Sequence, residues 1–256
     1  MSKFLVAGFW LLVNAAVSAQ DARQIVTESQ NRSRAKSERY EGTLEMVGSS
    51  NKVNLKRWTY QRIGSFGESK SILRFTAPTE LKGLALLIVN HPDRSSDQWM
   101  WTPAIERERR IALQDRSTRF FGTDFSFEDL EERDIALFDY KILGEEAIDN
   151  APCWKIESKP KESKSSQYTS SVLWIRKDNF VTAQVENLSN SPGAKLVRRI
   201  HYSDLEKVDN IWTPRTVEVF DAARNSHTLL KIEKLQYNAP MRDEDFTLEA
   251  LRRGSS

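Results

Sequence analysis

Alternation of apolar and polar side chains runs along most of this chain and constrains its fold more than any other feature. In Tyr40–Met46, the residues Tyr, Gly, Leu and Met alternate with Glu, Thr and Glu. A period of two residues is typical of a β-strand with one buried face. Similar short segments follow at Lys52–Ile63, Ser69–Phe75, Gln98–Pro103, Glu106–Ala112, Trp154–Lys159, Thr169–Lys177, Phe180–Leu188, Lys195–Leu205, Ile211–Phe220 and His227–Tyr237. Leu84–Val89 is apolar on both faces, so it should be a strand that is covered on both. Together these segments predict a mainly β fold, an antiparallel meander with an apolar face.

Two segments outside this pattern are predicted to be helices. Asp21–Arg39 is polar, has no Gly or Pro, and carries Ile25 and Val26 on a narrow apolar stripe. Asp243–Arg253 begins with acidic residues and ends with two arginines, an order that suits the helix dipole.

The beginning of the chain predicts a cleaved secretory signal peptide at residues 1–19. Lys3 supplies a positive charge, Phe4–Val13 is an apolar run, and Val17-Ser18-Ala19 places small side chains at the cleavage site. The apolar run is about ten residues, whereas a bilayer span needs roughly 20. The alternative is an uncleaved N-terminal anchor helix. No repeat, linker or low-complexity tract divides the remainder, so we expect residues 20–256 to form a single domain.

Charge and cysteine content exclude several classes of protein. The chain has 38 Lys+Arg against 36 Asp+Glu, so it offers no general positive field for a nucleic-acid backbone. A single Cys excludes a disulfide framework and a Cys-based zinc site. The three His residues have no partner at metal-ligand spacing, and no nucleophile-elbow, phosphate-loop or dinucleotide-binding motif is present. We therefore expect no metal, no cofactor and no enzymatic activity. A hydrolase of envelope lipids, the third possibility, would need polar side chains that converge in space.

Aromatic residues make up 10% of the chain and gather on strand faces. Trp58 shares a face with Tyr60, Trp99 shares one with Trp101, and Trp174 shares one with Val172. A sheet face with such large side chains must be covered. Helices and a lid could cover it permanently, or a bound apolar ligand could share the task. The alternative is a fully packed core without a cavity.

The segment Arg119–Leu137 differs from both strand blocks that flank it. It holds four Phe residues around a Gly and then becomes acidic, with a short helix predicted at Phe127–Glu132 and Ser126 as its N-cap. An aromatic loop of this kind fits a lid over an open sheet. It fits equally well an ordinary crossover whose Phe residues fill the core.

A basic run lies close before this segment, at Arg107, Arg109 and Arg110. Guanidinium groups beside the Trp99 and Trp101 pair could hold an anionic headgroup through bidentate hydrogen bonds. They could instead pair with the acidic residues Glu128–Asp134 and fix the lid.

Several motifs are specific in combination. Between residues 75 and 130 they are Phe75-Thr76-Ala77-Pro78, Lys82–Leu87, Asp97-Gln98-Trp99 running to Pro103, Arg107–Ile111 and Phe121–Leu130; further along they are Cys153-Trp154, Val172–Ile175, Trp212-Thr213-Pro214, Tyr237–Pro240 and Asp245–Thr247. Together they resemble the LolA-like outer membrane lipoprotein-sorting protein family, the broader family rather than LolA itself. The resemblance covers essentially the whole chain after the signal peptide.

The resemblance implies a fold and a function. The fold would be a curved antiparallel sheet, an incomplete β-barrel of roughly 11 strands, with helices capping an apolar cavity. The function would be that of a periplasmic carrier, which catalyses no reaction and binds a lipid or lipoprotein acyl chain non-covalently. Implied partners are an inner-membrane RND/MMPL-type exporter or an outer-membrane acceptor, and we expect a monomer. The alternative is an exporter-associated adaptor module without cargo.

This interpretation assigns roles to particular side chains. In strand geometry only one face of each strand can line a cavity. The predicted wall consists of Trp58, Phe75, Trp99, Trp101 and Trp174, the predicted cover of Phe120, Phe121, Phe125 and Phe127, and the headgroup site or lid latch of Arg107, Arg109, Arg110, Asp124, Glu128 and Asp129.

Overall fold

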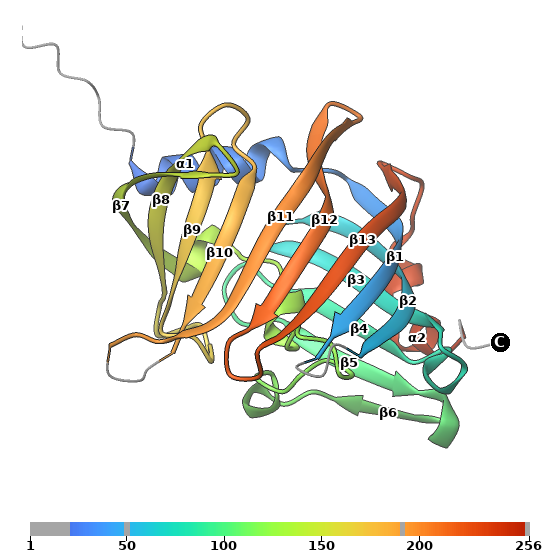
Figure 1. Ribbon diagram of the computed structural model, residues 1–256. Coiled ribbons are helices and arrows are strands. Elements are labelled where there is room, and N and C mark those ends of the chain that lie inside the picture. Colours follow the sequence, from blue (N-terminus) through green and yellow to red (C-terminus); the bar gives the residue numbers. More distant parts are fainter. Residues whose placement is uncertain (1–20, 49–51, 190–192, 254–256) are drawn as a thin grey trace, which may run out of the picture.

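A computed structural model describes residues 21–48, 52–189 and 193–253. In these residues one sheet of 13 antiparallel strands has the order β6-β5-β4-β3-β2-β1-β13-β12-β11-β10-β9-β8-β7. The sheet curls strongly around one inner face and stays open between its edge strands, β6 and β7 (Figure 1). The predicted curved, incomplete barrel is therefore confirmed. The predicted signal peptide lies outside the described residues.

The first strand block comprises β1 (Ser37–Val47), β2 (Val53–Ser65), β3 (Glu68–Ala77), β4 (Ala85–Asn90), β5 (Asp97–Thr102) and β6 (Arg107–Arg110). The second comprises β7 (Phe138–Ile148), β8 (Ala151–Pro160), β9 (Ser170–Arg176), β10 (Thr182–Leu188), β11 (Leu196–Val208), β12 (Ile211–Asp221) and β13 (Ser226–Tyr237). Short 3₁₀ turns are η1 (Thr79–Leu81), η2 (Pro103–Ile105), η3 (Leu113–Asp115), η4 (Glu128–Leu130), η5 (Ile135–Leu137) and η6 (Asp243–Phe246).

Of the 13 strands in the described residues, only β7 has no counterpart among the segments that the sequence predicts as strands. It is an edge strand, and most of its side chains are exposed. Ile142 and Leu143 are adjacent and both are partly exposed to solvent, so no two-residue alternation marks the strand. A strand that buries little leaves a weak pattern in the sequence.

The N-terminal helix is shorter than predicted. Helix α1 (Ala22–Arg32) begins after Asp21, whose side chain accepts a hydrogen bond from the backbone N–H of Arg23 at 3.3 Å. It ends at Arg32 because residues from Ser37 onward pair with β2 and β13 instead. Ile25 and Val26 are buried, as the apolar stripe predicts, and α1 packs against β7, β9 and η5.

The C-terminal segment is divided into two elements rather than one helix. Thr247, in extended conformation, separates η6 from α2 (Leu248–Arg253). Phe246 and Leu251 pack on the outer face of the sheet, where Ile72, Leu87 and Trp101 are buried beneath them. Helix α2 therefore covers the outside of β4 and β5 (Figure 1).

Strand order also explains the unusual segment between the two strand blocks. The chain proceeds from β1 to the edge strand β6, and the next strand, β7, lies at the opposite edge. Residues 111–137 make this connection, and Ile111, Phe120, Phe125 and Phe127 are buried in the core of the inner face. The segment is thus a crossover whose Phe residues fill the core. Within the predicted helix Phe127–Glu132, the acidic part forms only the short 3₁₀ helix η4. Ser126 Oγ accepts from the backbone N–H of Asp129 there, at 3.3 Å.

Candidate functional site

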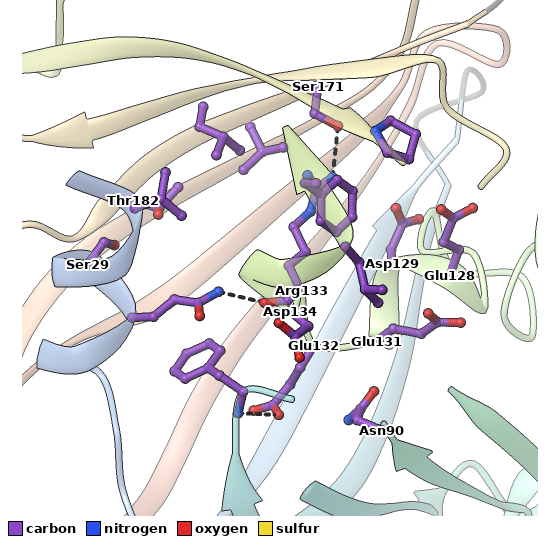
Figure 2. A pocket seen from close by; sticks show the side chains of 18 of the residues that line it. Ser29, Asn90, Glu128, Asp129, Glu131, Glu132, Arg133, Asp134, Ser171 and Thr182 are labelled. Atoms are coloured by element: carbon purple, nitrogen blue, oxygen red, sulfur yellow. Dashed lines mark hydrogen bonds between the residues drawn. The ribbon is translucent and has the colours of Figure 1, made fainter. Parts of the chain in front are cut away.

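A cavity of about 340 Å³ lies between α1, the inner face of β7–β11 and the acidic segment Glu128–Asp134 (Figure 2). Its volume falls within the range of small-molecule sites, about 300–1,000 Å³. The β4–β5 loop, the β2–β3 turn, the β8–β9 loop and the start of β12 also contribute to the lining.

Strand register divides the sheet side of this cavity into two rows. One row, here called the apolar row, consists of Leu173, Val185 and Ile200, which are register neighbours on β9, β10 and β11. A second row, here called the polar row, lies two residues further along each strand and consists of Ser171, Asn187 and Arg198. Ser171 and Asn187 line the cavity, and Arg198 lies beside it. Both rows face inward because residues two apart share a strand face. The cavity wall is therefore apolar on one side and polar on the other.

Helix α1 covers the cavity from above the sheet. Val26 contributes to the lining, and Gln30 Nε2 donates to the backbone carbonyl of Arg133 at 2.6 Å. The Arg23 guanidinium donates to the carbonyls of Ile135 at 3.2 Å and Phe138 at 2.8 Å. These bonds join the helix to the end of the crossover segment, and together the two cover the site.

Asp129 attaches the acidic segment to the polar row. Its carboxylate accepts from the Arg198 guanidinium at 2.8 Å and from the Tyr168 hydroxyl at 2.8 Å. The Asp129 and Arg198 side chains are 1% and 4% exposed, so the ion pair is fully desolvated. Burial, and next the Asp129 charge, raise the pKa of Tyr168 well above its usual value. Tyr168 therefore stays a neutral hydrogen-bond donor.

Two further carboxylates of the segment have buried cationic partners. Glu131 accepts from Arg116 at 2.7 Å and from Lys164 at 2.6 Å. Glu132 lies 3.3 Å from the Arg62 guanidinium and accepts from the backbone N–H of Phe66 at 2.9 Å. Glu128 takes neutral donors, among them the backbone N–H of Gln167 at 2.9 Å. The acidic segment is thus tied to the protein at most of its positions.

Two residues of the predicted wall, Trp58 and Phe75, pack with the predicted cover in one cluster outside the cavity lining. Phe120, Trp58 and Phe75 are 0%, 2% and 1% exposed. The ring centroids of Phe120 and Phe75 are 5.4 Å apart, and that of Phe127 is 5.4 Å from Phe120. The remaining members of this Phe cluster are Phe121 and Phe125. The structure brings these residues together as core, and their contact with a ligand stays a prediction.

Three of the predicted wall residues lie on the outer face of the sheet. Trp101 is buried beneath α2, and Trp99 packs against the same cluster. Trp174 packs with Cys153 and Val172 on the outside of β9, whereas Leu173 and Ile175 on the other face line the cavity. Alternation identified the two faces of each strand correctly, but it carries no signal for which face is inside.

The predicted headgroup arginines lie on the edge strand β6, away from the acidic segment. Arg110 pairs with Asp97 and lies over the Trp99 ring, 5.8 Å from its centroid. Arg109 is 3.8 Å from Asp115, and Arg107 is exposed. The cations that pair with residues 128–134 come from other parts of the chain, so the structure does not bring the predicted latch together.

Asp124, the remaining predicted latch residue, is buried and fixes the Phe-rich loop to β13. Its carboxylate accepts from Arg119 at 2.6 Å, Ser226 at 2.6 Å and Thr228 at 2.7 Å. Glu128 and Asp129 alone of the predicted site residues line the cavity.

Sequence reasoning missed the apolar row, which lines the sheet side of the cavity, and Arg133, which lines it from the acidic segment. The apolar row could have been found as the face of β9 opposite Trp174. Arg133 gives no signal, because in the sequence it is one charge within an acidic run.

Comparisons with known proteins support the fold described above. A family model described as an uncharacterized protein matches residues 67–253. A DUF1329 family protein from Desulfovibrio piger is similar in structure, with a TM-score of 0.85, 25% identity, and coverage of 90% of this chain and 97% of that chain. A candidate outer membrane lipoprotein-sorting protein domain from Vibrio parahaemolyticus gives a TM-score of 0.85 at 22% identity, covering 91% and 98%. The chain belongs to the family that this model describes, and it shares its fold with the DUF1329 protein and the lipoprotein-sorting protein domain.

A LolA superfamily protein from Nitrosomonas europaea has the same fold, with a TM-score of 0.70, 20% identity and coverage of 90% of this chain and 98% of that chain. No curated protein sequence matches the chain. Among the described residues, no helix is both long and apolar enough to cross a membrane. In the same residues, no group of three or more His, Cys, Asp or Glu side chains is placed to hold a metal ion.

Proposed function

We propose that this protein binds the acyl chain of a lipid or lipoprotein non-covalently in the cavity and carries it through the periplasm. The observation that supports the proposal most is the division of the cavity wall into an apolar and a polar row. An amphiphile presents the same division, with an apolar chain and a polar headgroup.

The energetics of acyl transfer call for a cavity of this kind. Each CH₂ group costs about 0.8 kcal/mol when it is exposed to water, so a long chain needs an enclosed apolar site during transfer. The apolar row and Val26 offer such a surface beneath α1. The cover consists of helix α1 and the end of the crossover segment, and neither of them is a strand of the sheet.

We further propose that the chain is exported through its signal peptide and that residues 20–256 act as one LolA-like domain. Its exchange partner would be an inner-membrane RND/MMPL-type exporter or an outer-membrane acceptor, as the family resemblance implies. Cross-linking in intact cells, followed by mass spectrometry of the captured membrane proteins, tests this part. Capture of neither class would contradict it.

The proposed carriage includes no chemical step. The polar groups at the cavity hold one another in ion pairs and hydrogen bonds, as in Asp129 with Arg198 and Glu131 with Lys164. Incubation of the purified protein with a labelled phospholipid should therefore leave the lipid intact. Release of a fatty acid or headgroup would favour the hydrolase instead.

The test of carriage is direct. Protein purified from the native periplasm is extracted with organic solvent, and the extract is analysed by mass spectrometry for a stoichiometric lipid. In parallel, the delipidated protein is titrated with a fluorescent fatty acid. A preparation without lipid that also fails to bind the fatty acid would contradict the carrier function and favour an adaptor without cargo.

A further inference from the structure

The side chain of Arg133 enters the cavity from the acidic segment and points toward the polar row (Figure 2). Its Nη2 donates to Ser171 Oγ at 2.8 Å and to Asn187 Oδ1 at 3.0 Å. The guanidinium also lies over the Phe138 ring, 5.3 Å from the centroid. Polar row and ring together fix the orientation of the guanidinium plane.

Arg133 differs from the other buried cations of this region in its partners. Arg116 and Lys164 pair with Glu131, and Arg198 pairs with Asp129. The hydrogen bonds of Arg133 go to neutral oxygens, and no carboxylate pairs with it in the part of the chain that the structure describes. Its Nη1 is buried and has no hydrogen-bond partner among those residues. Arg133 as a whole is only partly buried, but a buried donor atom without a partner is costly and calls for an explanation, such as a ligand that binds it.

The surroundings of Arg133 suit the headgroup end of an amphiphile. Tyr140 and Tyr202 line the same cavity. Burial raises the pKa of each phenol to about 12 even though the charge of Arg133 acts in the opposite direction. Both phenols therefore remain neutral and able to donate a hydrogen bond. The apolar row lies next to the polar row, two residues away along each strand.

We propose that Arg133 binds the anionic headgroup of the carried amphiphile, through Nη1, while its chain lies along the apolar row. This inference rests on the proposed function and adds the substrate class to it. The anionic oxygen group is a carboxylate, as in a free fatty acid, or a phosphate, as in a phospholipid. Planar guanidinium groups match both.

The test compares three ligands with the same type of chain, which are laurate, lauryl phosphate and lauryl alcohol. Their affinities are measured by calorimetric titration of the delipidated protein and of Arg133→Gln and Arg133→Lys. We expect the wild type to bind an anionic ligand about 10–100-fold more tightly than the alcohol. Arg133→Gln should lose this preference and keep the affinity for the alcohol, and Arg133→Lys should retain part of it.

Arg199→Gln is the matched control, because it removes the same charge from the outward side of β11, where Arg199 pairs with Glu186. It should bind all three ligands as the wild type does. If Arg133→Gln does not fold, the inference is tested by two measurements: the preference of the wild type for an anionic ligand over the alcohol, and the partial loss of that preference in Arg133→Lys. A stronger preference for laurate identifies a carboxylate headgroup, and one for lauryl phosphate identifies a phosphate.

The outcomes separate this inference from the carrier function. Equal affinity for all three ligands, unchanged in Arg133→Gln, overturns the role of Arg133 and leaves the carrier function standing. Failure of all three ligands to bind overturns both.

Discussion

Over strands β1–β6 the inner face of the sheet is covered by the protein's own aromatic rings, whereas over β7–β11 it borders a cavity of about 340 Å³. In the first region, the filled half, Phe120 stacks on Phe75 and excludes any ligand-sized space. In the second, the cavity half, a helix and the acidic segment span the sheet without filling it. One fold thus fills half of its inner face with its own side chains and leaves a cavity over the other half.

The two halves also differ in how their covers are held. The Phe cluster is held by ring packing, and the buried Asp124 carboxylate fixes its loop to β13. The cover of the cavity half is held by hydrogen bonds and ion pairs such as Gln30 to the Arg133 carbonyl and Asp129 to Arg198. Polar attachments of this kind can be exchanged for contacts with water or a partner, so this half is the one suited to opening.

The largest expected effect tests whether the filled half is core. Phe120→Ala should lower the free energy of unfolding by about 3–5 kcal/mol, because it leaves a cavity in a fully buried cluster. Urea denaturation followed by Trp fluorescence measures it. Leu113→Ala, at a site 49% exposed, is the control and should change stability by about 0.5 kcal/mol or less. A small loss for Phe120→Ala combined with altered ligand binding would show that the Phe cluster is a lid.

The next effect concerns the attachment of the cavity cover. Asp129→Asn leaves Arg198 buried with only Asp221, at 3.4 Å, as its carboxylate partner. Removing one member of a buried pair costs about 3 kcal/mol or more. Chemical denaturation gives the value, with Glu41→Gln as control, since the exposed pair of Glu41 and Lys234 contributes about 1 kcal/mol or less. Equal losses in the two variants would contradict the structural role of Asp129.

A third prediction separates lining from core within the same sheet. Val185→Phe places extra volume in the cavity, so it should weaken fluorescent fatty acid binding about tenfold or more and change stability by about 1 kcal/mol or less. Val217→Phe adds the same volume to a buried position outside the lining and should cost about 1–3 kcal/mol, because a packed core resists overfilling. Binding titrations and denaturation curves of both variants check this. The distinction between cavity lining and packed core is contradicted if Val217→Phe, rather than Val185→Phe, blocks binding.

The smallest expected effect is a pH dependence at the rim of the filled half. Burial alone would raise the pKa of Asp97, but hydrogen bonds from Arg94, Arg110 and His91 outweigh burial and hold the pKa well below its usual value. A lowered folded-state pKa stabilises the protein above the unfolded value, about 3.9, and this stability is lost as the pH falls below it.

Asp97→Asn should therefore flatten the acid side of the stability curve, by about 1 kcal/mol or less because the partners Arg94 and Arg110 are exposed to solvent. Thermal unfolding between neutral pH and pH 3 provides the measurement. An unchanged slope in Asp97→Asn would mean that this carboxylate does not contribute to acid unfolding.

Much of the fold was readable in the sequence because alternation reports burial directly. Tyr40–Met46 and the strands from Trp154 onward bury one face each, so their period of two is strong. Strand β7 escaped detection because its exposed Ile142 and Leu143 carry no such pattern. Helix α1 was predicted too long, since nothing in its polar composition shows that Ser37 and its neighbours pair with β2 and β13.

The candidate site was harder to predict, for a reason that the tryptophans illustrate. Trp99, Trp101 and Trp174 look like cavity residues because they are large and share strand faces. Their faces turn outward, toward α2 or toward Cys153, and this depends on which way the sheet curls. Arg133 stayed hidden for a related reason: its distinguishing property is the absence of a carboxylate partner among the described residues, which only the folded chain reveals.

By itself the sequence determined the alternation of each strand, the Phe-rich crossover and the resemblance to the LolA-like family. These are local properties, set by neighbouring residues in the chain. The tertiary structure alone decided which strand faces turn inward and how the strands align. Because one step of register moves a whole face, alignment places Leu173 beside Val185 and Ser171 beside Asn187. That alignment creates an apolar row and a polar row, and with them the cavity.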